Sequence, residues 1–500
     1  MTVEKVGRAM SWNLLAKAAR FAAAPAAYIL IVRSLGKHQW GILSVLRTVS
    51  GLVIVVVSLG IGKSLLKYMP EMRVRGGLRE FTKVIKRLFV LQAAVWGGLL
   101  LLSYILGPKL GPFFDVDSPR FSLYLMVAVG FTAFEVIFAV IMSTLQSWYE
   151  TRKLGFVIVI GNIAYLLLLI LFMKQEWGII GVLSAGAVVS LGMSAVLASN
   201  ALSIVRESKD GGNGSPHLKQ ILLFSLPFVV TGVLNEIVWR HSEVIFLGHY
   251  SGVDMAGFFS LAYRVPQQML EFVPLSVWPL VMAGISEVYA RDSGALPRAV
   301  GMYYRLLYIL VIPIAAMGFA FSAPLVPILF GEEMIPAAPL MRLFFVVFSY
   351  SFLYTPLSMA LYVMEKSWVN MLVFTLLAMV NIGLDLALIP SYGLWGAFIP
   401  VAFVMILAIA VFSLVLRRIR PDIVKPAGFI LRCYAAALPT ALLAITAARW
   451  SSPAALAIQI PIGAVLLFLG FRFARIIGEE EKAIIKKLPI PMRERIVNYF

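Results

Sequence analysis

Long apolar stretches, separated by short polar connections, run through nearly the whole chain. A helix that crosses a bilayer needs about 20 consecutive, mostly apolar residues, and the chain contains fourteen such stretches. We predict membrane-spanning helices over 9–32, 41–62, 84–106, 121–145, 154–173, 178–202, 219–248, 253–284, 303–329, 337–363, 368–390, 393–416, 429–448 and 454–476. An even number of passes places both termini on the same side. The pattern therefore predicts an all-α integral membrane protein.

The composition agrees with lipid as the main solvent. Hydrophobic residues make up 61% of the 500 residues and charged residues only 14%, against about 25% charged in a typical soluble domain. A soluble fold could not bury so much apolar surface. We expect a multi-pass protein of the cell (plasma or inner) membrane.

The basic residues alternate between the two sides of the predicted helices. With the N-terminus inside, 31 of the 43 basic residues fall in inner segments and only eight in outer ones. Basic residues concentrate in cytoplasmic loops of membrane proteins, so this bias predicts that both termini are cytoplasmic. It also accounts for the net charge of +18 without a nucleic-acid partner.

A polar interruption around 203–218 divides six predicted helices from eight and has the composition of a flexible linker. We predict an N-terminal lobe over 1–205 with helices 1–6, a cytoplasmic linker over 206–218, a C-terminal lobe over 219–420 with helices 7–12, helices 13–14 over 421–476, and a basic cytoplasmic tail over 477–500.

A short pattern recurs on the two sides of the linker. Leu-Gly, a short loop, Gly-x-x-Ser and an arginine one turn later occur from Leu35 to Arg47 and again from Leu247 to Arg264. Internal repeats of this kind are common in transporters. The repeat predicts two pseudo-symmetric lobes.

Lys17, Arg20, Arg47 and Arg264 are cations that we place within membrane-spanning helices and not in the connections. A charged group inside a membrane helix costs about 2.5–3.5 kcal/mol on insertion scales, so such groups usually face water or a partner. A water-filled cavity lined by these cations would bind a phosphate or diphosphate. The alternatives are pairing with acids or carbonyls for packing and, for Lys17, extension to the membrane interface.

Acidic residues form a second set. Glu236, Arg240 and Glu243 follow a spacing that places them on one face of a helix, and Asn381 and Asp385 are four residues apart. Glu243 and Asp385 lie at matching depths in their predicted helices. Glu243, Asn381 and Asp385 could bind sodium or a proton; the alternative is a packing pair that shares one proton. Further charge partners in the cavity are Glu135, Glu236, Arg240 and Glu271.

The sequence offers no catalytic or cofactor motif. A single cysteine, Cys433, and four scattered histidines argue against a metal cluster. Gly62-Lys63-Ser64 lacks the upstream glycine of a phosphate-binding loop, since Val57 stands there. We expect no enzyme and no cofactor beyond sodium or a proton as coupling ion.

Several segments, taken in order, resemble one family. They are RSLGKHQWGILSVLRTV (33–49), SLGIGKSLLKYMPE (58–71), GVDMAGFFSLAYRV (252–265), SEVYARD (286–292), LFGEEMIPAAPLMRLF (329–344) and GLWGAFIP (393–400). The chain is similar over nearly its whole length to the polysaccharide and oligosaccharide flippases of the multidrug/oligosaccharidyl-lipid/polysaccharide superfamily, which are related to lipid II flippases.

The resemblance implies two lobes around a central cavity, alternating access, and a polyprenyl-diphosphate-linked glycan as cargo. It implies that Arg20, Arg47 and Arg264 bind the diphosphate, and that Glu243, Asn381 and Asp385 hold sodium. Two departures bear on the ion: helix 7 carries Glu instead of Asp, and helix 12 lacks an early hydroxyl residue, with Pro400 and Val401 there.

We therefore expect a monomeric flippase that moves the glycan to the outer leaflet and works with glycan polymerase or ligase machinery. Two other functions remain open: a cation-coupled multidrug exporter of the same superfamily, and a membrane glycan polymerase or ligase. Short outer loops, the longest over about 107–120, disfavour the enzyme.

Overall fold

The computed structural model describes residues 3–75, 78–116, 118–148, 150–206, 217–240, 242–449, 452–478 and 482. These residues form α-helices and two short 3-10 helices, η1 (Ser293–Ala295) and η2 (Glu332–Ala337), and contain no strand. The α-helices are α1 (Val3–Ser58), α2 (Ile61–Arg75), α3 (Leu78–Phe113), α4 (Ser118–Ser147), α5 (Thr151–Lys174), α6 (Gly178–Arg206), α7 (Leu218–Arg240), α8 (Ser242–Tyr250), α9 (Val253–Arg291), α10 (Leu296–Phe330), α11 (Ala338–Ser351), α12 (Thr355–Val363), α13 (Ser367–Ile419), α14 (Ala427–Arg449) and α15 (Pro453–Phe473).

The predicted all-helical membrane fold is confirmed. Ten helical segments of the described residues are long and apolar enough to cross a bilayer. The count is lower than fourteen partly because α1 and α13 each cover two predicted spans. The predicted linker 206–218 and tail 477–500 lie largely outside the described residues, so the predicted lobe boundaries stay a prediction.

Two glycines bend helices where loops were predicted. Gly36 in α1 has φ 69° and ψ 177°, and Gly393 in α13 has φ 53° and ψ −124°. Residues with a Cβ rarely adopt such positive φ values, whereas glycine does so freely. Each glycine therefore separates two helices, as the predicted pairs of spans required, and α1 and α13 each comprise two helices that meet at a kink.

One predicted span ends early. The stretch 41–62 was expected to be a single helix, but α1 ends at Ser58, and Leu59 and Gly60 turn the chain with φ of 47° and 65°. A separate helix, α2, follows in the segment that was expected to be a polar connection. The prediction missed α2 because its many basic residues lower its mean hydropathy.

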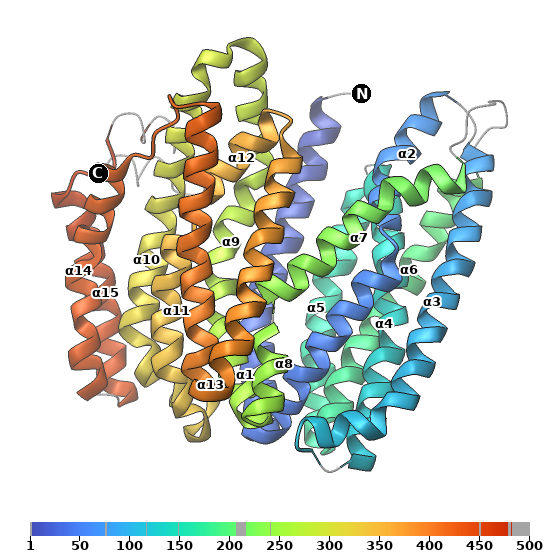
Figure 1. Ribbon diagram of the computed structural model, residues 1–500, viewed down its shortest axis with the longest axis horizontal. Helices are drawn as coiled ribbons and strands as arrows, with labels where there is room; N and C mark the ends of the chain where they lie inside the picture. The colour runs from blue at the N-terminus through green and yellow to red at the C-terminus, as the bar shows by residue number, and fades with distance from the viewer. Residues whose placement is uncertain are drawn as a thin grey trace. The chain divides into compact units, whose positions relative to one another are not determined.

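The chain divides into two compact units. The first comprises 1–257 and 385–394, and the second comprises 258–384 and 395–500. In the first unit α3 and α4 lie side by side, and in the second α14 packs against α15 (Figure 1). Each unit has its own apolar core: Phe81 and Leu154 belong to that of the first, and Tyr304 and Phe412 to that of the second.

The repeated glycines meet in the first unit. A Cβ on Gly41 would lie 2.0 Å from the carbonyl oxygen of Val253, and one on Gly257 would lie 3.0 Å from the Cα of Gly41. Trp40 also donates a hydrogen bond of 2.9 Å from Nε1 to the carbonyl of Gly257. The start of α9 therefore packs directly against the backbone of α1, which requires glycine at both positions.

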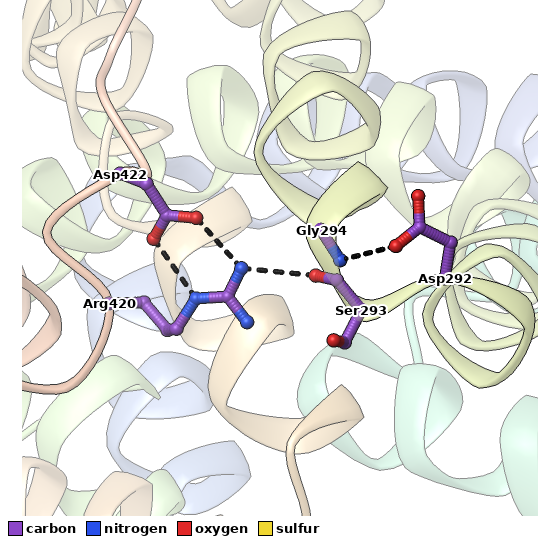
Figure 2. Close-up of polar contacts among 5 residues, drawn as sticks. All are labelled: Asp292, Ser293, Gly294, Arg420 and Asp422. Carbon is purple, nitrogen blue, oxygen red and sulfur yellow. Dashed lines mark hydrogen bonds and ion pairs between the residues drawn. The ribbon is translucent and has the colours of Figure 1, made fainter.

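In the second unit, the end of α13 is tied to the connection between α9 and α10 (Figure 2). Arg420 binds both carboxylate oxygens of Asp422, at 2.9 and 2.7 Å, and donates to the carbonyl of Ser293 at 3.0 Å. Asp292 accepts a hydrogen bond from the backbone of Gly294 at 2.8 Å. The Arg420 guanidinium holds the pKa of Asp422 below its usual range through this hydrogen bond.

Candidate functional site

Arg47 is a half-buried cation among aromatic rings in the first unit. Its guanidinium carbon lies 5.9 Å from the ring centroids of both Tyr28 and Trp40. These two rings pack edge to face, with centroids 5.7 Å apart. The negative faces of aromatic rings attract a guanidinium and help to hold it in an apolar setting. The rings therefore position Arg47 while leaving part of it accessible.

A tyrosine of α5 and an acid of α4 complete this region. Arg47 donates a side-chain hydrogen bond to the hydroxyl of Tyr165. The carboxylate of Glu135 interacts electrostatically with the same hydroxyl. Glu135 is exposed, although it stands in the middle of an apolar helix. A guanidinium has five N–H donors, so the bond to Tyr165 leaves capacity for a phosphate.

Glu236 of α7 approaches the same face of α1. A Cβ on Gly51 would lie 3.0 Å from the Oε2 atom of Glu236, and Gly51 is one turn beyond Arg47 on the same side of the helix. The structure thus brings three predicted residues, Arg47, Glu135 and Glu236, into one polar region of the first unit. We call this region, with Tyr165, the Arg47 region.

A second region of the first unit holds two buried acids. Glu243 at the start of α8 is 1% exposed and Asp385 of α13 is fully buried. The two carboxylates interact electrostatically, and the hydroxyl of Ser242 donates a hydrogen bond of 2.8 Å to Oδ2 of Asp385. Two buried carboxylates in such proximity need a proton or a cation between them. We call this group the acid pair.

Asn381, the third predicted ion ligand, lies one helical turn before Asp385 on α13. It is 1% exposed and falls in the second unit. Its predicted role as an ion ligand stays a prediction. Among the described residues there is no group of three or more His, Cys, Asp or Glu side chains that could hold a metal ion.

The second unit contains Arg264 and Glu271 on α9. Arg264 is half-buried, and its Nε atom is buried with no hydrogen-bond partner among the described residues. Glu271 accepts a hydrogen bond of 3.0 Å from Gln267 and interacts electrostatically with Tyr354. Glu271 therefore has contacts within its own unit, and the role of Arg264 as a phosphate ligand stays a prediction.

The side chains of three predicted site residues lie outside the described part of the structure. Lys17 and Arg20 belong to the first part of α1, and Arg240 is the last residue of α7. Their predicted roles rest on the sequence.

Sequence reasoning missed Tyr165 and Ser242. Tyrosine and serine cost little inside an apolar helix, so their presence there carries no signal comparable to that of a charge. Ser242 could have been noticed because it adjoins Glu243 in the sequence. Tyr165 has no such neighbour in the sequence.

The sequence of the chain matches the profile of a known family. The profile of the family described as polysaccharide biosynthesis protein matches residues 6–283. Comparison with curated protein sequences gives no significant match.

Among solved structures, the fold is similar to that of the lipid II flippase MurJ in an inward closed conformation. The TM-score is 0.73 at 15% identity, covering 93% of this chain and 98% of MurJ. A multidrug resistance MATE transporter of the MOP superfamily, solved facing inward, gives 0.67 at 15% identity, covering 80% and 94%. A MOP superfamily transporter from Pyrococcus furiosus gives 0.58 at 16% identity, covering 83% and 95%.

Proposed function

The chain belongs to the polysaccharide biosynthesis protein family, and we propose that it is a flippase for a polyprenyl-diphosphate-linked oligosaccharide. It is a multi-pass membrane protein with a transporter fold. The proposed cargo crosses from the inner to the outer leaflet of the cell membrane by alternating access, for export of a cell-surface polysaccharide.

The observation that carries the proposal is the accessible guanidinium of Arg47 within membrane helices. Tyr28, Trp40 and Tyr165 orient it, and its remaining N–H donors suit a diphosphate, which accepts paired charge-assisted hydrogen bonds. Arg20, Arg264 and Lys17 are the other proposed diphosphate ligands. The lipid tail of the cargo stays in the bilayer.

The acid pair supplies the proposed coupling ion. Glu243, Asp385 and the hydroxyl of Ser242, with Asn381, would bind sodium or a proton in one conformation of the transporter more tightly than in the other. An ion can shift a conformational equilibrium only through such a difference in affinity. The ion gradient then drives the return of the empty protein.

Purified protein in proteoliposomes tests the proposal. The cargo is a fluorescent polyprenyl-diphosphate disaccharide, and its arrival in the opposite leaflet is followed by quenching, with and without a sodium or proton gradient. We expect flipping by the wild type and its loss in Arg47→Ala. Equal flipping by the wild type and protein-free vesicles would refute the proposal.

The exposed carboxylate of Glu135 favours a second candidate, a multidrug exporter of cationic compounds. A carboxylate open to a wet interior attracts cations, although Arg47 in the same region repels them. Growth of a drug-sensitive host expressing the protein, in the presence of cationic dyes, separates the two. Resistance that depends on Glu135 but not on Arg47 would favour drug export.

A further inference from the structure

A polar pocket lies at one end of the first unit, away from the apolar helix surfaces. It has a volume of about 590 Å³ and is built from the kinked part of α1, the connection between α3 and α4, and the start of α6. These segments lie at the same end of the unit (Figure 1). The basic-residue bias predicts that this end is the outer one.

The pocket combines a polar mouth with an apolar floor. The exposed side chains of His38, Gln39, Asp115 and Arg120 surround the mouth, with the half-buried Tyr124 beside them. The floor is made by three buried aliphatic side chains: Ile42, Val116 and Ile179. Pockets of about 300–1,000 Å³ with such a lining hold small-molecule ligands.

The polar groups of the mouth are available to a ligand. In the part of the chain that the structure describes, the side chains of Gln39, Asp115, Arg120 and Tyr124 form no hydrogen bond within the protein. His38 uses Nδ1 in a contact of 2.9 Å with Asp254, which leaves Nε2. Lys37 also pairs with Asp254, at 3.5 Å. These contacts with Asp254 hold Lys37 and His38 in position beside the pocket.

Asp115 lies in the cap that ends α3. Asp115 has φ 54°, a left-handed conformation that non-glycine residues seldom adopt. Successive turns at the end of α3 hold it, through hydrogen bonds from the backbone N–H of Asp115 to Pro112 and of Val116 to Gly111. These two bonds form the usual cap of a helix C-terminus, which has one residue in the left-handed conformation. The cap places the carboxylate of Asp115 at the mouth of the pocket.

We infer that this pocket binds a neutral saccharide. One carboxylate and one guanidinium at the mouth disfavour both a simple anion and a simple cation. A neutral sugar offers hydroxyl donors and acceptors to Asp115, Arg120 and Gln39, and its C–H faces suit the aliphatic floor and the ring of Tyr124. The volume admits about one or two sugar rings.

The role of the pocket rests on the proposed function. The glycan of a lipid-linked cargo is the saccharide that would reach it, at the outer side, after the diphosphate has been released from the Arg47 region. Binding there would disfavour return of the glycan to the inner leaflet. Binding of a free sugar can be measured independently of any transport.

Saturation-transfer NMR on the full-length protein in nanodiscs tests the pocket directly. The probes are methyl glucoside, methyl N-acetylglucosaminide and, as an acidic comparison, glucuronate. We expect transfer to at least one neutral glycoside and weaker transfer to glucuronate. No transfer to either neutral probe, or transfer to glucuronate alone, would overturn the inference.

Variants locate the binding. Asp115→Asn keeps a residue that tolerates positive φ but removes the charge, and Arg120→Ala removes the guanidinium. Each should weaken binding by about three- to tenfold, because the Asn amide accepts a weaker hydrogen bond than the carboxylate and Ala donates none from its side chain. Gln39→Trp should block the pocket. The matched control is Arg152→Ala, which removes an exposed arginine near the start of α5. Unchanged binding in Gln39→Trp would also overturn the inference.

Flipping assays connect the pocket to transport. With a glycan-bearing diphosphate lipid and a bare diphosphate lipid as cargoes, Gln39→Trp should slow net flipping of the first more than of the second. Equal effects on the two cargoes would overturn the proposed role. Failure of the wild type to flip either cargo would instead count against the proposed function, and NMR would still decide whether the saccharide binds.

Discussion

The Arg47 region and the acid pair lie in the same unit but differ in how far their charged side chains are exposed. Arg47 is half-buried, Glu135 beside it is exposed, and aromatic rings support the guanidinium without enclosing it. Glu243 and Asp385 are at most 1% exposed, and Ser242 adds a hydroxyl to them. An open cation suits a large anionic ligand, whereas a sealed acid pair admits only a proton or a bare ion.

The largest expected effect comes from Arg47→Ala. Charge-assisted hydrogen bonds contribute about 1.5–3 kcal/mol, so flipping of the diphosphate lipid should fall by about ten- to a hundredfold. Arg47→Lys keeps the charge but loses the paired geometry and should recover only part of the rate. The exposed Arg152→Ala serves as control. Full activity of Arg47→Ala would show that the accessible guanidinium does not bind the diphosphate, and would contradict the difference in role between the two regions.

Asp385→Asn tests the sealed region. It removes one of two interacting carboxylates, so the remaining acid no longer needs a shared proton or cation. We expect the acceleration of flipping by an imposed sodium or proton gradient to disappear, with a smaller loss of the gradient-free rate. The control is Glu332→Gln, which neutralises an exposed carboxylate of the second unit. A gradient response that survives in Asp385→Asn would mean that the pair serves packing alone.

Gly41→Ala tests the packing of the helix that carries Arg47, because Gly41 lies against the start of α9. The added methyl group would lie 2.0 Å from the Val253 carbonyl, and overpacking of this kind costs about 1–3 kcal/mol. A lower thermal midpoint by fluorescence-detected size exclusion is expected. Gly186→Ala, with no atom within 4 Å of the new Cβ, should be neutral or stabilising.

Removal of one hydroxyl from each region should have the smallest effects. Ser242→Ala deletes the donor to Asp385, and Tyr165→Phe deletes the partner of Arg47. A single hydrogen bond contributes about 0.5–1.5 kcal/mol net, and water can replace it only in the open region. Ser242→Ala should therefore shift the ion concentration for half-maximal flipping more than Tyr165→Phe changes the rate. The reverse order would argue that the acid pair is open to water.

Much of the fold could be predicted because apolar stretches of helical length are a strong signal. The breaks at Gly36 and Gly393 fall where one predicted span ends and the next begins. The separate helix α2 after the turn at Leu59 could not be predicted, because its basic residues lower its mean hydropathy. Glycine is frequent in membrane helices, so its presence alone does not distinguish a kink from a close contact such as that of Gly41.

In the candidate site, too, some residues have a clear signal in the sequence and others depend on how the helices pack. Arg47, Glu243 and Asp385 were identifiable because charge inside a membrane helix is costly and rare. Tyr165, Ser242 and the aromatic support from Tyr28 and Trp40 depend on which helices lie side by side, and no local pattern encodes that. The saccharide pocket is the extreme case, since its walls come from segments more than a hundred residues apart.

The central claim is that an accessible guanidinium inside the membrane recognises a diphosphate. The most direct test is the binding of farnesyl diphosphate and farnesyl monophosphate to the protein in nanodiscs, measured for the wild type and for Arg47→Ala. We predict that the wild type prefers the diphosphate by at least about tenfold and that the variant loses this preference. Equal affinity of the wild type for both lipids, or an unchanged preference in Arg47→Ala, would contradict the claim.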